Sequence, residues 1–308
     1  MLGIYPGFGG EQTLLEFERD LGRPLAVVVQ FGGHRDPSDL LGSYRGALRG
    51  LRRWLARGEL YAVTVPLAFG DGDARAEGSR AAGRNALEET AGGAHDETYR
   101  AVGRLLVDSG VPDAVLRIGH EFDGDWYPWS AQGNCEHFIN AFRHVVDVFR
   151  SVSPEFRMDW SGTVPHFREW GRCAYPGDEY VDVIGIDVYD RVGSMKDFAP
   201  DDETWHDPEA VWHERILPTL REHRAFAIRR NKPVSFPEWG LATASGVEGR
   251  AFGGDNPTFV RSMARWLRAL PEHGPGSLAY HAYFLGSDAH DIRGLPNAHA
   301  AFVDEFAR

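Results

Sequence analysis

Long apolar runs are missing from this 308-residue sequence: no stretch of about eighteen apolar residues occurs, so a membrane-spanning helix is not expected. Basic residues are also few, because 33 lysines and arginines face 45 aspartates and glutamates, which gives a formal net charge of −12. An acidic surface repels phosphate backbones and anionic lipids. Neither nucleic acid nor a membrane surface is therefore expected as a partner.

Motifs for common cofactors are missing as well. The glycine-rich stretch Gly7–Gly10 lacks the strand–turn–helix context of a phosphate-binding loop, so no ATP, nicotinamide or flavin cofactor is expected. No secretory signal is visible, because the first strand candidate begins at Leu2. A mature domain cut from a secreted precursor and a cytoplasmic protein both fit this start, and the secreted protein is favoured.

Cysteine is scarce, with Cys135 and Cys173 as the only two. Both lie in candidate loops, so a disulfide that joins these loops and a pair of free buried thiols both remain open. A two-cysteine metal site lacks the CxxC spacing. No metal is expected.

Eight short apolar runs recur along the chain, and amphipathic segments lie between them. The runs are Leu2–Tyr5, Leu25–Phe31, Leu60–Leu67, Ala114–Glu121, Phe156–Trp160, Val181–Tyr189, Pro233–Glu238 and Leu278–Leu285. The segments include Tyr44–Ala56, Asp96–Ser109, Glu136–Ser151, Pro208–Arg230 and Pro257–Leu270. Strands that alternate with helices at this spacing predict an α/β fold, a (β/α)8 TIM barrel. No linker or repeat divides residues 1–308, so a single catalytic domain and a monomer are expected.

Two loop features accompany this pattern. Asn256 or Asp255 can cap a helix that begins at Pro257, because proline suits the first helical position. Asp71 and Asp73 resemble a calcium loop only faintly, since the remaining ligands of that pattern are missing, and a flexible loop is favoured.

Polar and aromatic residues end several of the predicted strands, at the face of a TIM barrel that carries the active site. They are Arg117, His120 and Glu121; Asp187 and Tyr189; Glu238 and Trp239; and His281 and Tyr283. Glu121 and Glu238 are 117 residues apart, which is about three strand–helix units of a barrel. We expect the two strand ends to face each other across the barrel mouth. Two carboxyl groups about 5 Å apart suit a retaining glycosidase, whereas about 6.5–9.5 Å would suit an inverting one.

Strand alternation places Arg117 on the same face as Glu121 and one layer deeper. A buried arginine needs a charge partner, and a strand-end carboxylate is the expected one. His120 has the opposite parity, so the strand must bulge or twist near its end if both His120 and Glu121 are to face the pocket.

Tryptophans gather after the predicted strand ends. Five of the nine follow such ends, and they predict a sugar-binding cleft, because the C–H faces of sugar rings stack on indole: Trp126, Trp129, Trp160, Trp170 and Trp239.

The segment Arg117–Trp129, with its His-Glu pair, glycine and two tryptophans, resembles glycoside hydrolase family 26, a β-mannanase-like family of the retaining (β/α)8 clan. Gly3–Gly7, Gly185–Tyr189 and Pro233–Gly240 are similar to three further strand ends of the family. The resemblance implies an endo-acting hydrolase of a β-linked polysaccharide, with Glu121 as acid/base and Glu238 as nucleophile. It further implies that Tyr189 hydrogen-bonds the nucleophile, that His120, Asp187 and Trp126 contact or orient the substrate, and that Arg117 is a supporting cation.

Two departures from the family pattern touch the sugar pocket. The eighth strand lacks a tryptophan platform, whose place Tyr283 or His281 would take, and Trp239 stands where phenylalanine is usual. Another β-glycan, such as a glucan, a xylan or an exopolysaccharide, therefore stays open beside mannan. Two further alternatives are a non-enzymatic carbohydrate-binding barrel and a metal-dependent barrel hydrolase, the latter with ligand candidates His34, His120, His281 and His290.

Overall fold

The computed structural model describes the chain except for residues 8–9, 71–78, 191–206, 243–252, 287–288 and 308. Its strands follow one another in the order β1 to β8 in a closed sheet, and the β1–β8, β3–β4, β4–β5 and β7–β8 ladders are parallel. The predicted (β/α)8 barrel is confirmed. No helix in the described ranges combines the length and the apolar character needed to cross a membrane.

Each of the eight apolar runs overlaps one strand. The strands are β1 (Leu2–Tyr5), β2 (Val27–Gln30), β3 (Leu60–Val65), β4 (Val115–Ile118), β5 (Arg157–Thr163), β6 (Val183–Tyr189), β7 (Val234–Gly240) and β8 (Leu278–Phe284). Two boundaries differ from prediction in a way that affects the site. β4 ends at Ile118, three residues before Glu121, and β5 runs three residues beyond Trp160 to Thr163.

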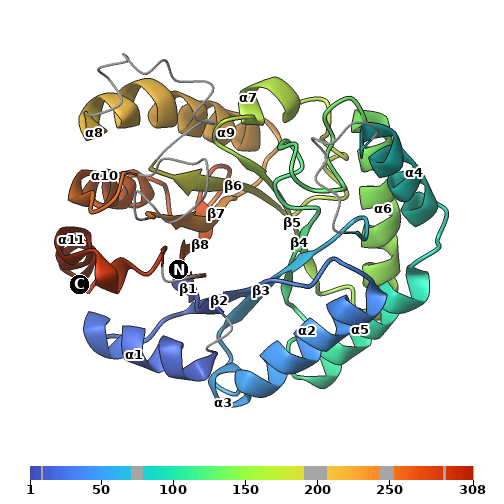
Figure 1. Cartoon of the computed structure of the whole chain (residues 1–308), viewed down its shortest axis with the longest axis horizontal. Helices are drawn as coiled ribbons and strands as arrows, with labels where there is room; N and C mark the ends of the chain where they lie inside the picture. The colour runs from blue at the N-terminus through green and yellow to red at the C-terminus, as the bar shows by residue number, and fades with distance from the viewer. Residues whose placement is uncertain (8–9, 71–78, 191–206, 243–252, 287–288, 308) are drawn as a thin grey trace. The chain divides into compact units, whose positions relative to one another are not determined.

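The chain divides into two compact units. The central unit is Val28–Ile186, and the terminal unit combines Met1–Val27 with Asp187–Arg308. The helices of the central unit are α2 (Pro37–Gly50), α3 (Arg52–Leu55), α4 (Ser79–Ala91), α5 (Asp96–Asp108), α6 (Cys135–Val152) and α7 (Phe167–Trp170). Within this unit α4 and α5 pack against α6, and α5 also packs against α2 (Figure 1).

The terminal unit contains α1 (Glu11–Leu21), α8 (Pro208–Ala210), the π-helical turn η3 (Val211–Ile216), α9 (Leu217–Arg229), α10 (Pro257–Arg268), the 3-10 turn η4 (Ile292–Gly294) and α11 (Pro296–Phe306). Asn256 caps α10 by accepting a hydrogen bond from the Phe259 backbone N–H at 3.1 Å, as its sequence predicts. Asp255 instead accepts from the backbone of Asn297 and Ala298 at the start of α11. The Asp71 and Asp73 stretch lies outside the described residues.

Candidate active site

The backbone turns sharply where β4 ends. Gly119 and Glu121 have φ of 55° and 52°, in the left-handed region. A side chain at Gly119 would meet Leu67 Cδ1 at 2.7 Å, so only glycine fits there. Glu121 carries a Cβ in this region at a cost of about 1–3 kcal/mol, a kind of strain that often marks functional sites. Strand alternation therefore stops at Ile118, so parity places neither Glu121 nor His120. The turn lies near the end of the strand, where the sequence predicts a bulge or twist if both residues are to face the pocket.

The Glu121 carboxyl group is held by a neighbouring indole. Trp126 Nε1 donates a hydrogen bond to Glu121 Oε2 at 2.7 Å, and both side chains are half-buried. The Trp126 ring also lies 5.7 Å from the His166 ring. A Cβ at Gly124 would meet the Trp126 ring at 2.4 Å, so this glycine lets the loop fold back. The loop thus orients the Glu121 carboxyl group through its Oε2 atom.

His120 is buried beside aromatic rings. Its Nε2 lies 3.2 Å from the Tyr127 hydroxyl, and its ring packs edge-on against Phe31 at 5.6 Å. Burial, reinforced by the positive charge of Arg117, lowers the pKa of His120 well below its usual value. The imidazole is therefore neutral at neutral pH and can donate or accept a single hydrogen bond at each nitrogen according to its tautomer.

Arg117 lies fully buried in β4, as predicted. Its Nη2 donates to Ser161 Oγ at 3.3 Å, and its guanidinium lies 5.7 Å from the centre of the Phe31 ring. These contacts make Arg117 a part of the packing beneath the end of β4. Its carboxylate partner stays a prediction.

In the terminal unit, Glu238 near the end of β7 is nearly buried, with 8% of its surface exposed. The Tyr189 hydroxyl donates a hydrogen bond to Glu238 Oε1 at 2.6 Å, which confirms the contact expected from the family resemblance. A carboxylate oxygen of Asp187 lies within 4.8 Å of one of Glu238. Burial, and secondarily the Glu238 charge, raises the pKa of Tyr5 to about 12, so this phenol keeps its proton.

A cluster of rings beside Tyr189 was not predicted. Phe284 at the end of β8 lies 5.0 Å from Tyr5, 6.2 Å from Tyr189 and 5.1 Å from His290. His290 in turn lies 5.5 Å from Tyr189, and its Nδ1 is bonded to Leu241 O at 2.9 Å. The sequence carried a signal for Phe284, since it has the opposite parity to His281 and Tyr283 on the same strand.

His281 and Tyr283 do not provide the sugar platform that the sequence suggested. Both are buried, and both point toward the α11 rings: His281 lies 5.5 Å from Phe306 and Tyr283 lies 5.4 Å from Phe302. Burial lowers the pKa of His281 well below its usual value, and its Nδ1 accepts a hydrogen bond from Trp239 Nε1. The physical reason is strand parity, which turns 281 and 283 toward the helices.

Of the five tryptophans predicted to face a sugar, three are buried and two are half-exposed. Trp129, Trp160 and Trp239 are at most 1% exposed and cannot stack on a sugar. They pack instead on Tyr127 at 4.4 Å, Phe122 at 4.6 Å and Phe302 at 5.7 Å, respectively. Trp129 Nε1 also donates to His120 O, which supports the neighbouring histidine. Trp126 and Trp170 remain half-exposed.

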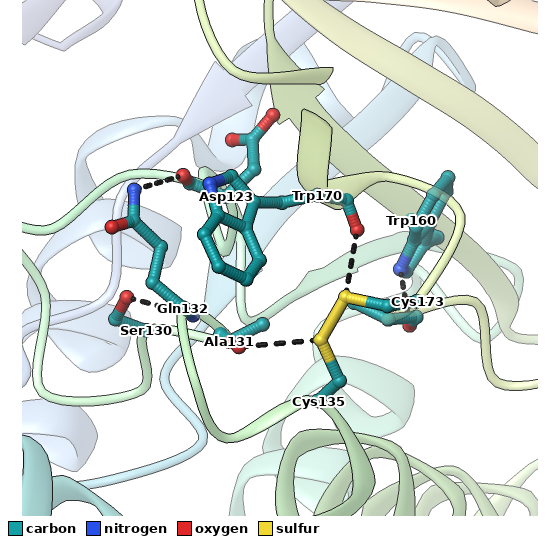
Figure 2. Close-up of a disulfide and its surroundings, with 9 residues drawn as sticks. Asp123, Ser130, Ala131, Gln132, Cys135, Trp160, Trp170 and Cys173 are labelled. Carbon is teal, nitrogen blue, oxygen red and sulfur yellow. Dashed lines mark hydrogen bonds between the residues drawn. A yellow bond between two sulfur atoms is a disulfide. The ribbon is translucent and has the colours of Figure 1, made fainter. Parts of the chain in front are cut away.

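Cys135 and Cys173 form a disulfide, with their Cα atoms 5.7 Å apart (Figure 2). Of the two alternatives that the sequence left open, the disulfide is the one observed. It ties the first residue of α6 to the segment after α7. Both loops that follow β4 and β5 are thereby anchored to each other at their far ends.

Removal of this disulfide is expected to lower the free energy of unfolding. The bond closes a 38-residue separation, and the lost restraint on the unfolded chain corresponds to about 4 kcal/mol. Denaturant unfolding with and without a thiol reductant measures this loss of free energy of unfolding. The double variant C135S/C173S is the matched control, since it should be destabilised already and insensitive to reductant. Equal stability of the oxidised and reduced protein would contradict the expectation.

Part of the chain is similar in sequence to known glycoside hydrolases. Residues 100–215, which include Glu121, Asp187 and Tyr189, match the sequence model of glycosyl hydrolase family 26. Endoglucanase H of Acetivibrio thermocellus is 32% identical over 145 residues, covering 44% of this chain and 15% of that protein. The mannan endo-1,4-beta-mannosidase of Bifidobacterium adolescentis is 27% identical over 171 residues, covering 54% and 16%. The chain thus spans about a sixth of the length of these relatives.

Solved structures agree on the fold. The catalytic domain of the Bacillus sp. JAMB-750 GH26 endo-beta-1,4-mannanase superposes with a TM-score of 0.63 at 19% identity, covering 94% of this chain and 79% of that chain. Bacillus subtilis mannanase man26 gives a TM-score of 0.60 at 12% identity, covering 98% and 83%. The family model over residues 100–215 and these two barrels agree with the family resemblance found in the sequence.

Proposed function

We propose that this chain is a retaining, endo-acting hydrolase of a β-linked polysaccharide, mannan first, that works through two glutamates. The observation that carries the proposal is the 2.6 Å hydrogen bond from Tyr189 to Glu238. A carboxylate that is nearly buried at a barrel strand end, with one oxygen fixed by a phenol, suits a nucleophile that must attack in one direction.

Glu238 is assigned as the nucleophile. Its Oε2 forms a bond to the anomeric carbon while the bond from that carbon to the leaving oxygen breaks. Tyr189 holds the other oxygen, and the nearby Asp187 carboxylate is placed to accept a sugar hydroxyl. Asp187 is 2% exposed, so a hydrogen bond from a ligand would form with little competition from water.

Glu121 is assigned as the acid/base. It gives its proton to the leaving oxygen in the first step, and in the second it takes a proton from the water that releases the sugar from Glu238. The Trp126 N–H orients the carboxyl group through Oε2, and proton transfer is assigned to Oε1. Neutral His120, next to Glu121 in the chain, is assigned as a hydrogen-bonding group for the sugar, and Arg117, which donates to Ser161 Oγ, as the supporting cation.

Mannan is placed first because relatives of this chain bear mannosidase and mannanase names, and another β-glycan stays second because one relative is an endoglucanase. The half-exposed Trp126 and Trp170 are the proposed sugar-stacking rings of the central unit. The disulfide favours an oxidising compartment, and hence a secreted protein.

A panel of β-mannan, β-glucan and xylan tests the substrate assignment, with E238A as the inactive control. The proposal expects new reducing ends from mannan and a falling viscosity early in the reaction, as internal cleavage requires. Activity on glucan or xylan alone would refute mannan as the substrate, but the assignment as a glycosidase would stand. Oligosaccharide binding with no reducing ends from any glycan would favour the carbohydrate-binding barrel instead.

A further inference from the structure

The last strand residue of β5 has an unusual hydrogen-bond acceptor. β4 and β5 pair from Val115 with Arg157 to Arg117 with Asp159, but β4 ends at Ile118 while β5 continues to Thr163. The Thr163 N–H therefore extends past the paired part of β4. It donates instead to the Asp123 carboxyl group, at 3.0 Å to Oδ1 and 2.9 Å to Oδ2. A buried N–H needs an acceptor, and a side chain supplies it here.

The backbone next to this contact carries Glu121. Two residues before Thr163, Ser161 O accepts the Glu121 N–H at 2.8 Å, and the Gly124 N–H closes a turn onto Glu121 O at 3.0 Å. Residues 121–124 are thus attached to the end of β5 at two points, one through the main chain and one through Asp123. The left-handed φ of Glu121 lies between these attachments and the end of β4.

Asp123 fits this position closely. It is fully buried, and a Cβ at Gly162 would meet its Oδ2 at 2.6 Å, so the strand carries glycine where the carboxyl group rests on it. On the other side of the loop, Gln132 Nε2 donates to Asp123 O at 2.8 Å, as Figure 2 shows, and Ser130 Oγ donates to Gly124 O. Asp123 therefore joins the Glu121 turn to β5 and to the segment before the disulfide.

The contact does not depend on a counter-charge. No ion pair to Asp123 occurs among the described residues, and burial raises the pKa of Asp123 to about 7, against the opposing hydrogen bonds from Thr163. Both the carboxylate and the carboxylic acid keep a carbonyl-type oxygen that accepts an N–H. The acceptor, rather than the charge, is what the Thr163 N–H requires.

We propose that Asp123 is a positioning residue, whose carboxyl oxygen holds the turn of residues 121–124 on the end of β5 and so fixes the Glu121 carboxyl group for proton transfer. The inference rests on the proposed role of Glu121 as acid/base. Because Trp126 reaches Glu121 from the same loop, a shift of the turn would also disturb that hydrogen bond.

Two variants of Asp123 test this. D123L keeps the approximate side-chain shape, removes the acceptor and suits the buried site, so the protein is expected to fold. Its kcat on a polysaccharide is expected to fall about 100-fold with little change in KM, because a catalytic group misplaced by about 1 Å costs this much. An aryl glycoside with a good leaving group needs no proton in the first step, so D123L should release the first phenol in a burst at nearly the wild-type rate, whereas the second step, which needs Glu121 as base, should stay slow. D123N keeps the acceptor and should restore kcat.

E121A, measured beside these variants, separates the two claims. If E121A keeps full activity on polysaccharide, both the acid/base role and the inference are wrong. If E121A is inactive there and D123L is fully active, the inference alone is wrong. A first-step rate of D123L on the aryl glycoside that falls as far as its kcat on polysaccharide, or a D123N kcat as low as that of D123L, would also overturn it. Thermal unfolding of each variant checks that it is folded at the temperature at which the rates are compared.

Discussion

Replacement of Glu238 by alanine is expected to lower kcat on polysaccharide by a factor on the order of 10⁵–10⁶, the scale seen when an enzyme loses its nucleophile. Without the carboxylate, no oxygen is in place to form the covalent intermediate. The fold should survive, since Glu238 lies near the end of β7 and its hydrogen-bond partner Tyr189 lies at the end of β6, away from the packed middle of the strands. Steady-state rates and sugar-binding calorimetry on E238A check both halves of this expectation.

Two controls sharpen the test of Glu238. Exposed Glu272 belongs to the same unit, so E272A should retain wild-type rates. Azide added to E238A should restore turnover of an activated glycoside and give a glycosyl azide of inverted configuration, because the small anion attacks where the carboxylate stood. Wild-type rates of E238A without azide would show that the nucleophile lies elsewhere.

Replacement of Glu121 by glutamine is expected to lower kcat on polysaccharide by about 10²–10⁴-fold, the usual contribution of general acid–base catalysis. Glutamine keeps the shape and can still accept the Trp126 N–H, but it cannot give a proton. The first step should therefore be nearly normal on an aryl glycoside with a good leaving group. A burst of released phenol, followed by slow turnover, would report the accumulated intermediate.

Glu136 provides the matched control for Glu121. It lies exposed in the first turn of α6, in the same unit, and E136A should behave as the wild type. If E121Q slowed the polysaccharide and the activated substrate equally from the first turnover, its role would be structural and the acid/base assignment would be wrong.

The eight strands were predictable because each buried strand of a parallel barrel is a short apolar run bounded by turn residues. The exact end of β4 was not. Glutamate rarely adopts a left-handed φ, and the hydrogen bond from the Glu121 N–H to Ser161 O on β5 helps to hold it there. Such non-local support cannot be read from the residues around Glu121.

The aromatic residues were likewise only partly predictable from the sequence. Their position after strands was readable, but the face they occupy depended on parity at each strand end. Parity correctly separates Phe284 from Tyr283 on β8, whereas counting tryptophans did not separate the buried Trp129 and Trp239 from the half-exposed Trp126. The disulfide also needed the structure, because only the loop paths bring Cys135 and Cys173 to a Cα separation of 5.7 Å.

The stereochemistry of cleavage tests the two-glutamate proposal most directly. A retaining reaction passes through a covalent sugar on Glu238, and each of its two steps inverts the anomeric carbon. Proton NMR of the first product formed from a β-linked oligosaccharide, recorded before mutarotation, reads the configuration. The proposal predicts the β anomer, and a first product of the α configuration would contradict it.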